Sequence, residues 1–119
     1  MRIAISFLKV SLVICLAMSI LISCKKESSK KTPTCDGSHP TYNSAIKSII
    51  NGNCTSSGCH NAGSSNGDFT SYSGLAPYLN NGSFKREVLT NQTMPENGSL
   101  SQTQLNSIQC WVNDGYPEN

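Results

Sequence analysis

The stretch Cys54-Thr55-Ser56-Ser57-Gly58-Cys59-His60 brings two thiols and an imidazole close together in the chain. Four residues separate Cys54 from Cys59, and His60 follows the second cysteine directly. The intervening residues are small and polar, and Gly58 can adopt a positive φ without steric penalty. This loop can therefore bulge outward and still present both sulfur atoms to the same neighbouring group.

Two thiols beside an imidazole suit the covalent attachment of haem. Each thiol can add to one vinyl group, and the histidine that follows then supplies the proximal axial ligand of the iron. Two alternatives remain open for these residues. The cysteines can form a disulfide in an exported protein, with His60 incidental. A zinc site is a weaker alternative, because zinc takes about four ligands and the chain has only two histidines, His39 and His60.

The same stretch resembles the CxxCH attachment motif of the c-type cytochromes, with a wider gap between the cysteines. The Cys-His junction is intact, and widened versions of the motif are known in that family. The resemblance implies one haem c bound through Cys54 and Cys59, with His60 as the proximal ligand.

Residues 1–23 predict a targeting segment. Arg2 and Lys9 supply positive charge, and the apolar run over residues 12–22 is too short for a comfortable membrane span. The run ends in Leu21-Ile22-Ser23-Cys24, which resembles the lipobox of bacterial lipoproteins. That resemblance implies cleavage before Cys24 and lipid on this cysteine. The mature protein is then anchored to a bacterial membrane, facing the periplasm or the cell surface. An uncleaved N-terminal anchor is the alternative.

Residues 24–34 predict a flexible tether, because residues 25–34 contain no apolar side chain able to anchor a core. The formal charge of the whole chain is +2. From Cys35 onward, three basic residues against six acidic ones give a charge of −3. The basic excess therefore belongs to the signal and the tether, so the folded part lacks the usual electrostatic indication of nucleic-acid binding.

Residues 35–119 predict one small helical domain of about 85 residues, which has room for only a small apolar core. Apolar residues recur at helical spacing in four places: 42–50, 71–79, 84–89 and 101–113. We expect Gly52 to end the first helix as a left-handed cap and Pro77 to lie near a boundary of the second. Ser101 and Gln104 predict a capping box at the start of the last helix.

Met94-Pro95 lies in a polar loop over residues 90–98. A lone methionine usually fills a gap in a core, but this loop has little else to bury. The Met-Pro pair after a short helical region resembles the distal-ligand loop of class-I cytochromes c, and the helix over 101–113 resembles their closing helix. The resemblance covers residues 42–117. It implies Met94 as the sixth iron ligand, with His39 as the rival, and packing of Trp111 against Ile46 or Ile49.

The number of cysteines agrees with this interpretation. Cys15 is lost with the signal and Cys24 carries lipid, so once haem occupies its own pair, Cys35 and Cys110 remain for a disulfide in an oxidising compartment. Because Cys35 precedes the first helix and Cys110 lies on the last, the bridge also requires those helices to pack together. Two disulfides without haem balance the count equally well, so counting leaves both arrangements open.

We interpret the chain as an exported, lipid-anchored, all-α domain with a cytochrome-c-like fold of three to four helices around one covalent haem. Its expected function is to pass single electrons to and from a redox partner protein. It is not expected to be an enzyme, because His60 and Met94 fill both axial positions and no convincing acid–base or nucleophile set is present. One alternative is a non-haem binding or structural lipoprotein with two disulfides. Another is a haem enzyme or sensor with an open distal site.

Overall fold

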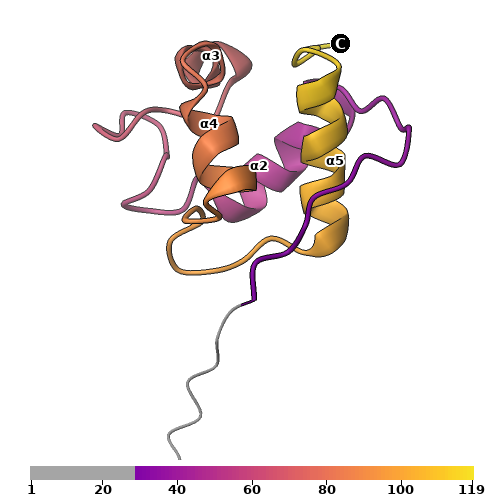
Figure 1. The fold of residues 1–119 in the computed structure, drawn as a ribbon. Coiled ribbons are helices and arrows are strands. Elements are labelled where there is room, and N and C mark those ends of the chain that lie inside the picture. The colour runs from indigo at the N-terminus through magenta and orange to yellow at the C-terminus, as the bar shows by residue number, and fades with distance from the viewer. Residues whose placement is uncertain (1–28) are drawn as a thin grey trace, which may run out of the picture.

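The computed structural model describes residues 29–119, so the predicted signal peptide and the lipidation site at Cys24 lie outside the described residues. Between residues 29 and 119 the chain forms helices and no strands, which confirms the all-α prediction. The helices are η2 (Tyr42–Ile46) continued by α2 (Lys47–Asn53), α3 (Tyr72–Asn80), α4 (Ser83–Lys85) continued by η3 (Arg86–Thr90), and α5 (Gln102–Asn113). Figure 1 shows α4 and α5 on either side of α2. No helix in this part of the chain is long and apolar enough to cross a membrane.

The first helix begins at a capping box formed by Thr41 and Ser44. It extends beyond the predicted end, and the prediction of Gly52 as a left-handed cap is wrong, since Gly52 lies within α2. The last turn is closed instead by two hydrogen bonds. The N–H of Cys54 donates to the carbonyl of Ile50 at 2.8 Å, and the side chain of Asn53 donates to the carbonyl of Ile49 at 2.7 Å. The helix therefore leads directly into residues 54–60, the predicted attachment loop.

The second helix, α3, is capped by Ser71, whose hydroxyl accepts from the N–H of Gly74 at 3.2 Å. Pro77 lies inside this helix, so its predicted place near a boundary is wrong. A proline in a helix interior removes the hydrogen bond to the residue four positions earlier. Pro77 and Ser73 are both exposed, so water can reach the turn from which that bond is missing.

The two remaining helical segments match their predicted places. Phe84, Val88 and Leu89 are buried along α4 and η3, as their spacing predicts. The capping box of Ser101 and Gln104 at the start of α5 is confirmed.

In the described residues the core consists of aliphatic and aromatic side chains and takes residues from every helix. Trp111 of α5 is fully buried, and its indole N–H donates to the carbonyl of Pro117 at 2.9 Å. Its aromatic neighbour on the first helix is Tyr42, at 6.4 Å between ring centroids, and Ile46 is buried in the same core. The N–H of Tyr42 also donates to the carbonyl of Pro117, at 2.9 Å. These contacts join the first and last helices.

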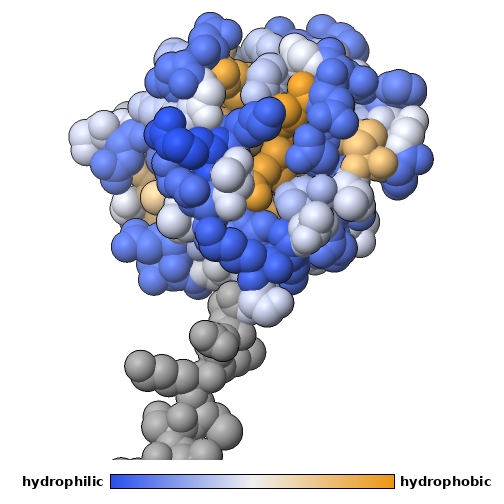
Figure 2. Space-filling view, viewed as in Figure 1, coloured by the Kyte–Doolittle hydropathy of each residue, from blue (hydrophilic) through white to orange (hydrophobic). Residues whose placement is uncertain are grey.

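The face of the molecule drawn in Figure 2 is mostly hydrophilic, with a narrow apolar strip at its centre.

The end of the predicted tether lies along α5 (Figure 1). The N–H of Thr34 donates to the side-chain oxygen of Asn106 at 3.0 Å, and the amide of Gln102 donates to the carbonyl of Thr32 at 2.8 Å. Further bonds involve Lys31. Residues from Lys31 onward are therefore hydrogen-bonded to the domain, ahead of the boundary at Cys35 that the sequence predicts.

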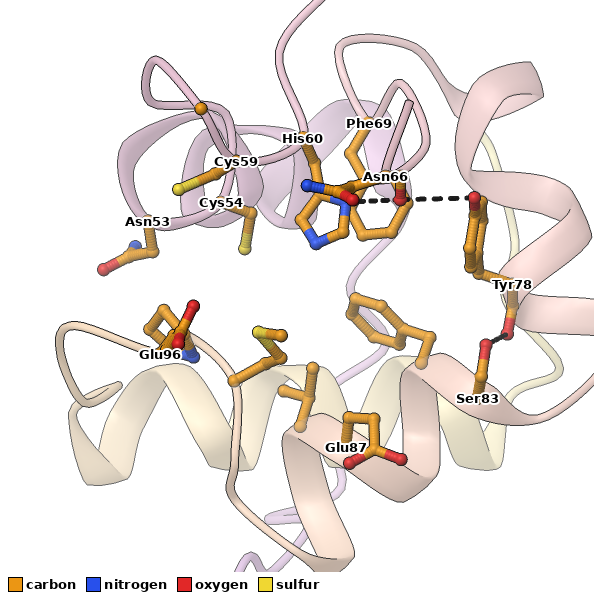
Figure 3. Close-up of a pocket in the computed structure, with 15 residues that line it drawn as sticks. Asn53, Cys54, Cys59, His60, Asn66, Phe69, Tyr78, Ser83, Glu87 and Glu96 are labelled. Carbon is orange, nitrogen blue, oxygen red and sulfur yellow. Dashed lines mark hydrogen bonds between the residues drawn. The ribbon is translucent and has the colours of Figure 1, made fainter. Parts of the chain in front are cut away.

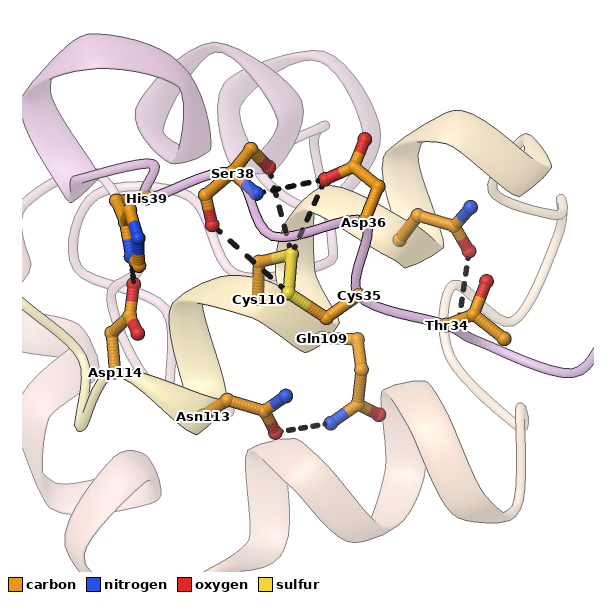
Figure 4. The surroundings of a disulfide bond; sticks show 10 residues. Thr34, Cys35, Asp36, Ser38, His39, Gln109, Cys110, Asn113 and Asp114 are labelled. Carbon is orange, nitrogen blue, oxygen red and sulfur yellow. Dashed lines mark hydrogen bonds and ion pairs between the residues drawn. A yellow bond between two sulfur atoms is a disulfide. The ribbon is translucent and has the colours of Figure 1, made fainter.

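Cys35 and Cys110 form a disulfide, the pairing left by the cysteine count (Figure 4). Cys110 is fully buried on α5, and the bridge ties that helix to the segment before η2. Ser38 lies beside it, with its hydroxyl 3.5 Å from the sulfur of Cys110. Ser38 also donates to the carboxylate of Asp36, which lowers the pKa of Asp36.

Two helical glycines predict opposite responses to alanine. Alanine normally stabilises a helix relative to glycine by about 1 kcal/mol. A Cβ on Gly52 meets nothing within 4 Å, so we expect Gly52→Ala to raise the free energy of unfolding by about 0.5–1 kcal/mol. A Cβ on Gly74 would lie 2.0 Å from the backbone oxygen of Asp68. Such crowding typically costs about 1–3 kcal/mol, so Gly74→Ala should lower the free energy of unfolding.

Chemical denaturation of both variants beside the wild type measures this difference. Gly52→Ala serves as the control for helix propensity. Equal stabilisation by the two substitutions would show that the start of α3 is not packed against Asp68.

Candidate functional site

A pocket of about 470 Å³ opens between the attachment loop and the segment around η3 (Figure 3). This volume lies within the range of about 300–1,000 Å³ typical of small-molecule and cofactor sites. Four of the residues predicted to bind a cofactor line it together: Cys54, Cys59, His60 and Met94. The other lining residues are Asn53, Gly58, Asn66, Phe69, Tyr78, Ser83, Phe84, Glu87, Val88, Pro95 and Glu96.

The attachment loop has a compact conformation despite its extra residues. The N–H of His60 donates to the carbonyl of Cys54 at 3.0 Å, and the N–H of Cys59 donates to the carbonyl of Ser56 at 2.9 Å. Gly58 has a φ of +82°, the conformation for which glycine is suited. The turn brings both cysteines and the histidine to one wall of the pocket (Figure 3).

The imidazole of His60 is held on two sides. It stacks on the ring of Phe69, with centroids 3.9 Å apart and planes 3° from parallel. Its Nδ1 lies 3.0 Å from the carbonyl oxygen of Asn66. Because a carbonyl only accepts, Nδ1 must donate, which leaves the lone pair of a neutral ring on Nε2. Histidine ligands of metals are commonly oriented by this kind of bond.

Tyr78 supports the same carbonyl. Its hydroxyl donates to the oxygen of Asn66 at 3.3 Å, and its ring meets Phe69 edge-on at 4.9 Å (Figure 3). Gly67 makes this approach possible, because a Cβ there would lie 2.2 Å from the hydroxyl of Tyr78. The oxygen that orients His60 is thus fixed by a second donor.

Cys54 and Cys59 are both free thiols. Burial raises the pKa of Cys54 to about 11, and the neighbouring Cys59 adds to the increase. Cys54 therefore stays protonated at neutral pH. The pairing of these two cysteines in a second disulfide, one of the alternatives for this stretch, does not occur in the structure.

Met94 lies in the loop after η3 and lines the pocket. The N–H groups of Thr93 and Met94 donate to the carbonyl of Glu87 at 3.0 and 3.3 Å, so the loop is fastened to η3. The hydroxyl of Thr93 donates to the Glu87 carboxylate at 2.6 Å. This bond makes the largest contribution to lowering the pKa of Glu87, and hydrogen bonds from Arg86 and Asn91 add to the effect. The Met94 side chain is 38% exposed and is the large apolar residue left open to solvent in the described chain.

His39, the rival iron ligand, does not line the pocket. Its side chain is 82% exposed, and its Nδ1 lies 2.9 Å from the carboxylate of Asp114 (Figure 4). Of the two residues considered as the distal ligand, Met94 lines the pocket and His39 does not.

The spacing of the donor atoms bears on the zinc alternative. Metal–ligand bonds to zinc are roughly 2.0–2.3 Å long, so its ligand atoms must converge closely. Among residues 29–119, one group of three such side chains has its ligand atoms within 4.8 Å of one another, namely Cys35, Asp36 and Cys110. Two of these are joined in the disulfide. In this part of the chain Cys54, Cys59 and His60 form no such group.

Comparison of the chain with known protein families, characterised proteins and solved structures gives no match. The functional assignment therefore depends on the pocket. The sequence alone does not indicate Asn66 or Tyr78, because Asn66 acts through a backbone carbonyl and Tyr78 through a long-range contact. Phe69 carries a weak signal, as an aromatic residue after a glycine- and serine-rich loop.

Proposed function

We propose that this protein is a single-haem c-type cytochrome that transfers electrons one at a time. One observation carries the proposal. Cys54, Cys59 and His60 meet Met94, far away in the sequence, around one pocket lined largely by apolar and aromatic side chains. This donor set combines two thiols suited to thioether bonds with an imidazole and a thioether suited to iron.

Each residue has a specific role in this proposal. Cys54 and Cys59 would hold the group covalently, and Nε2 of His60 and the sulfur of Met94 would bind its iron. Haem c bound there would supply an iron atom able to alternate between its ferric and ferrous states. The carbonyl of Asn66 keeps the His60 ring in one tautomer and orientation.

The surrounding side chains favour electron transfer over catalysis. Phe69, Phe84 and Val88 line the pocket with apolar surface, which would shield a haem there from water. With both His60 and Met94 bound to the iron, a haem here would offer no open coordination site to a substrate. The exposure of Met94 favours one second candidate, a haem enzyme or sensor whose distal site is open.

The proposal extends to the location of the protein. The lipobox-like stretch ending at Cys24 supports export and lipid anchoring to a bacterial membrane, with a redox partner protein nearby. The disulfide between Cys35 and Cys110 agrees with an oxidising compartment, where such bridges persist.

Covalent attachment is tested on the full chain, expressed in a host that attaches haem to exported proteins. The purified protein should be red with a Soret band. After denaturation in acid and acetone, the polypeptide mass should include one haem. The double variant Cys54→Ser/Cys59→Ser should lose this added mass completely, while Ser57→Ala, in the same loop, should keep it. Release of free haem from the wild type would refute covalent attachment, and a colourless wild type would favour the non-haem lipoprotein.

A further inference from the structure

A reciprocal pair of hydrogen bonds joins the tether to the segment between η3 and α5, which we call the Met94 loop. The backbone N–H of Lys31 donates to the side-chain oxygen of Gln92 at 3.0 Å. The side-chain amide of Gln92 donates in return to the carbonyl of Lys31. One glutamine side chain therefore satisfies both backbone groups of Lys31, as a neighbouring strand would.

Lys31 also binds the far end of the same loop. Its ammonium group donates to the carbonyl of Leu100 at 2.6 Å. Gln92 precedes Met94 and Leu100 follows it, so a single tether residue holds both ends of the loop that carries the proposed distal ligand.

Gln92 has an unusual backbone conformation. Its φ is +51°, in the left-handed region that non-glycine residues rarely adopt. Such conformations persist where the surrounding contacts enforce them, and they occur often at functional sites. The bonds to Lys31 are contacts of this kind. They connect Gln92 to a residue 61 positions earlier in the chain.

A second, smaller cavity places the tether behind Met94. It has a volume of about 160 Å³ and is lined by residues that include Lys31, Gln92 and Leu100. Met94 and Val88 line both this cavity and the larger pocket. These two side chains therefore separate the larger pocket from the tether.

We propose that Lys31 and Gln92 are positioning residues that hold the Met94 loop toward the larger pocket, so that docking of the tether sets how firmly the sixth ligand is held. The inference rests on the proposed function, in which haem fills that pocket. Loss of either side chain frees one end of the loop, so the Met94 sulfur would leave a bound iron more often.

Two substitutions separate this role from general stability. Gln92→Gly removes the side chain but suits the left-handed backbone, so it adds no strain. Lys31→Met removes the ammonium group and keeps a long side chain. Lys47→Met is the matched control, because Lys47 is an exposed lysine of α2 that lines neither cavity.

The experiment uses the full-length holoprotein. In Gln92→Gly and Lys31→Met, we expect a weaker near-infrared sulfur-to-iron band and several-fold faster binding of carbon monoxide to the ferrous form. Hydrogen exchange at the amides of Thr93 and Met94 should also accelerate several-fold. Lys47→Met should match the wild type in all three measurements.

The possible failures are distinguishable. Variants with covalent haem and wild-type values for the band, carbon monoxide binding and exchange overturn this inference and leave the proposed function intact. A wild type with covalent haem but no sulfur band also overturns the inference, because Met94 is then not a ligand. A wild type without haem overturns the proposed function itself, and the inference with it.

Discussion

Replacing Met94 with alanine is expected to abolish the near-infrared sulfur-to-iron band, lower the midpoint potential and allow carbon monoxide to bind the ferrous protein. A thioether is a soft ligand that favours ferrous iron, so its loss removes part of the preference for the reduced state. Because axial ligands set haem potentials over about 0.8 V, we expect a decrease on the order of 100 mV. Near-infrared spectroscopy, potentiometric titration and carbon monoxide binding measure the three effects.

Two further variants make this result specific. Met94→Leu keeps a side chain of similar size but removes the sulfur, so it should lose the band as completely as Met94→Ala. His39→Ala should change nothing, because His39 is exposed and paired with Asp114 outside the pocket. A wild type that lacks the band and binds carbon monoxide readily would instead favour the enzyme or sensor with an open distal site.

Removing the disulfide is expected to lower the free energy of unfolding by about 4 kcal/mol, from the chain entropy of the loop it closes. Cys35 and Cys110 are separated by 75 positions, so the bridge restricts most of the domain in the unfolded state. Typical domains are stable by only about 5–15 kcal/mol, so this loss is large. The variant Cys35→Ser/Cys110→Ala avoids placing a hydroxyl at the fully buried position.

Denaturant unfolding of this variant and of the wild type gives the difference, with chemically reduced wild type as the control for the substitutions themselves. Thiol labelling in denaturant without reductant should find neither Cys35 nor Cys110 free in the wild type. Labelling of both residues, or equal stability of variant and wild type, would contradict the role of the bridge.

Local signals in the sequence predict much of the fold. The last helix is predictable because Ser101 and Gln104 form their capping box within one turn. Gly52 and Pro77 mislead, because both have strong local preferences that the helices around them override. The helix that contains Gly52 continues through the hydrogen bonds of Asn53 and Cys54, which the glycine does not interrupt.

The candidate site is only partly predictable. Cys54, Cys59 and His60 lie close together in the sequence and form a recognisable motif. The prediction for Met94 depends only on the resemblance of the pair Met94-Pro95 to a distal-ligand loop. The support for His60 comes from the backbone of Asn66, and a backbone carbonyl leaves no mark on residue identity. The contact between Lys31 and Gln92 is equally hidden, because polar residues in two separate loops give no periodic pattern.

If the protein is anchored through Cys24, the early attachment of the tether limits how far the domain can move from the membrane. If lipid is bound to Cys24, only residues 25–30 remain between the anchor and the docked Lys31. Even fully extended, that stretch spans at most about 20 Å. The domain would then work in a thin layer beside the bilayer, where a partner held in the same membrane meets it at a high effective concentration and a freely diffusing partner does not.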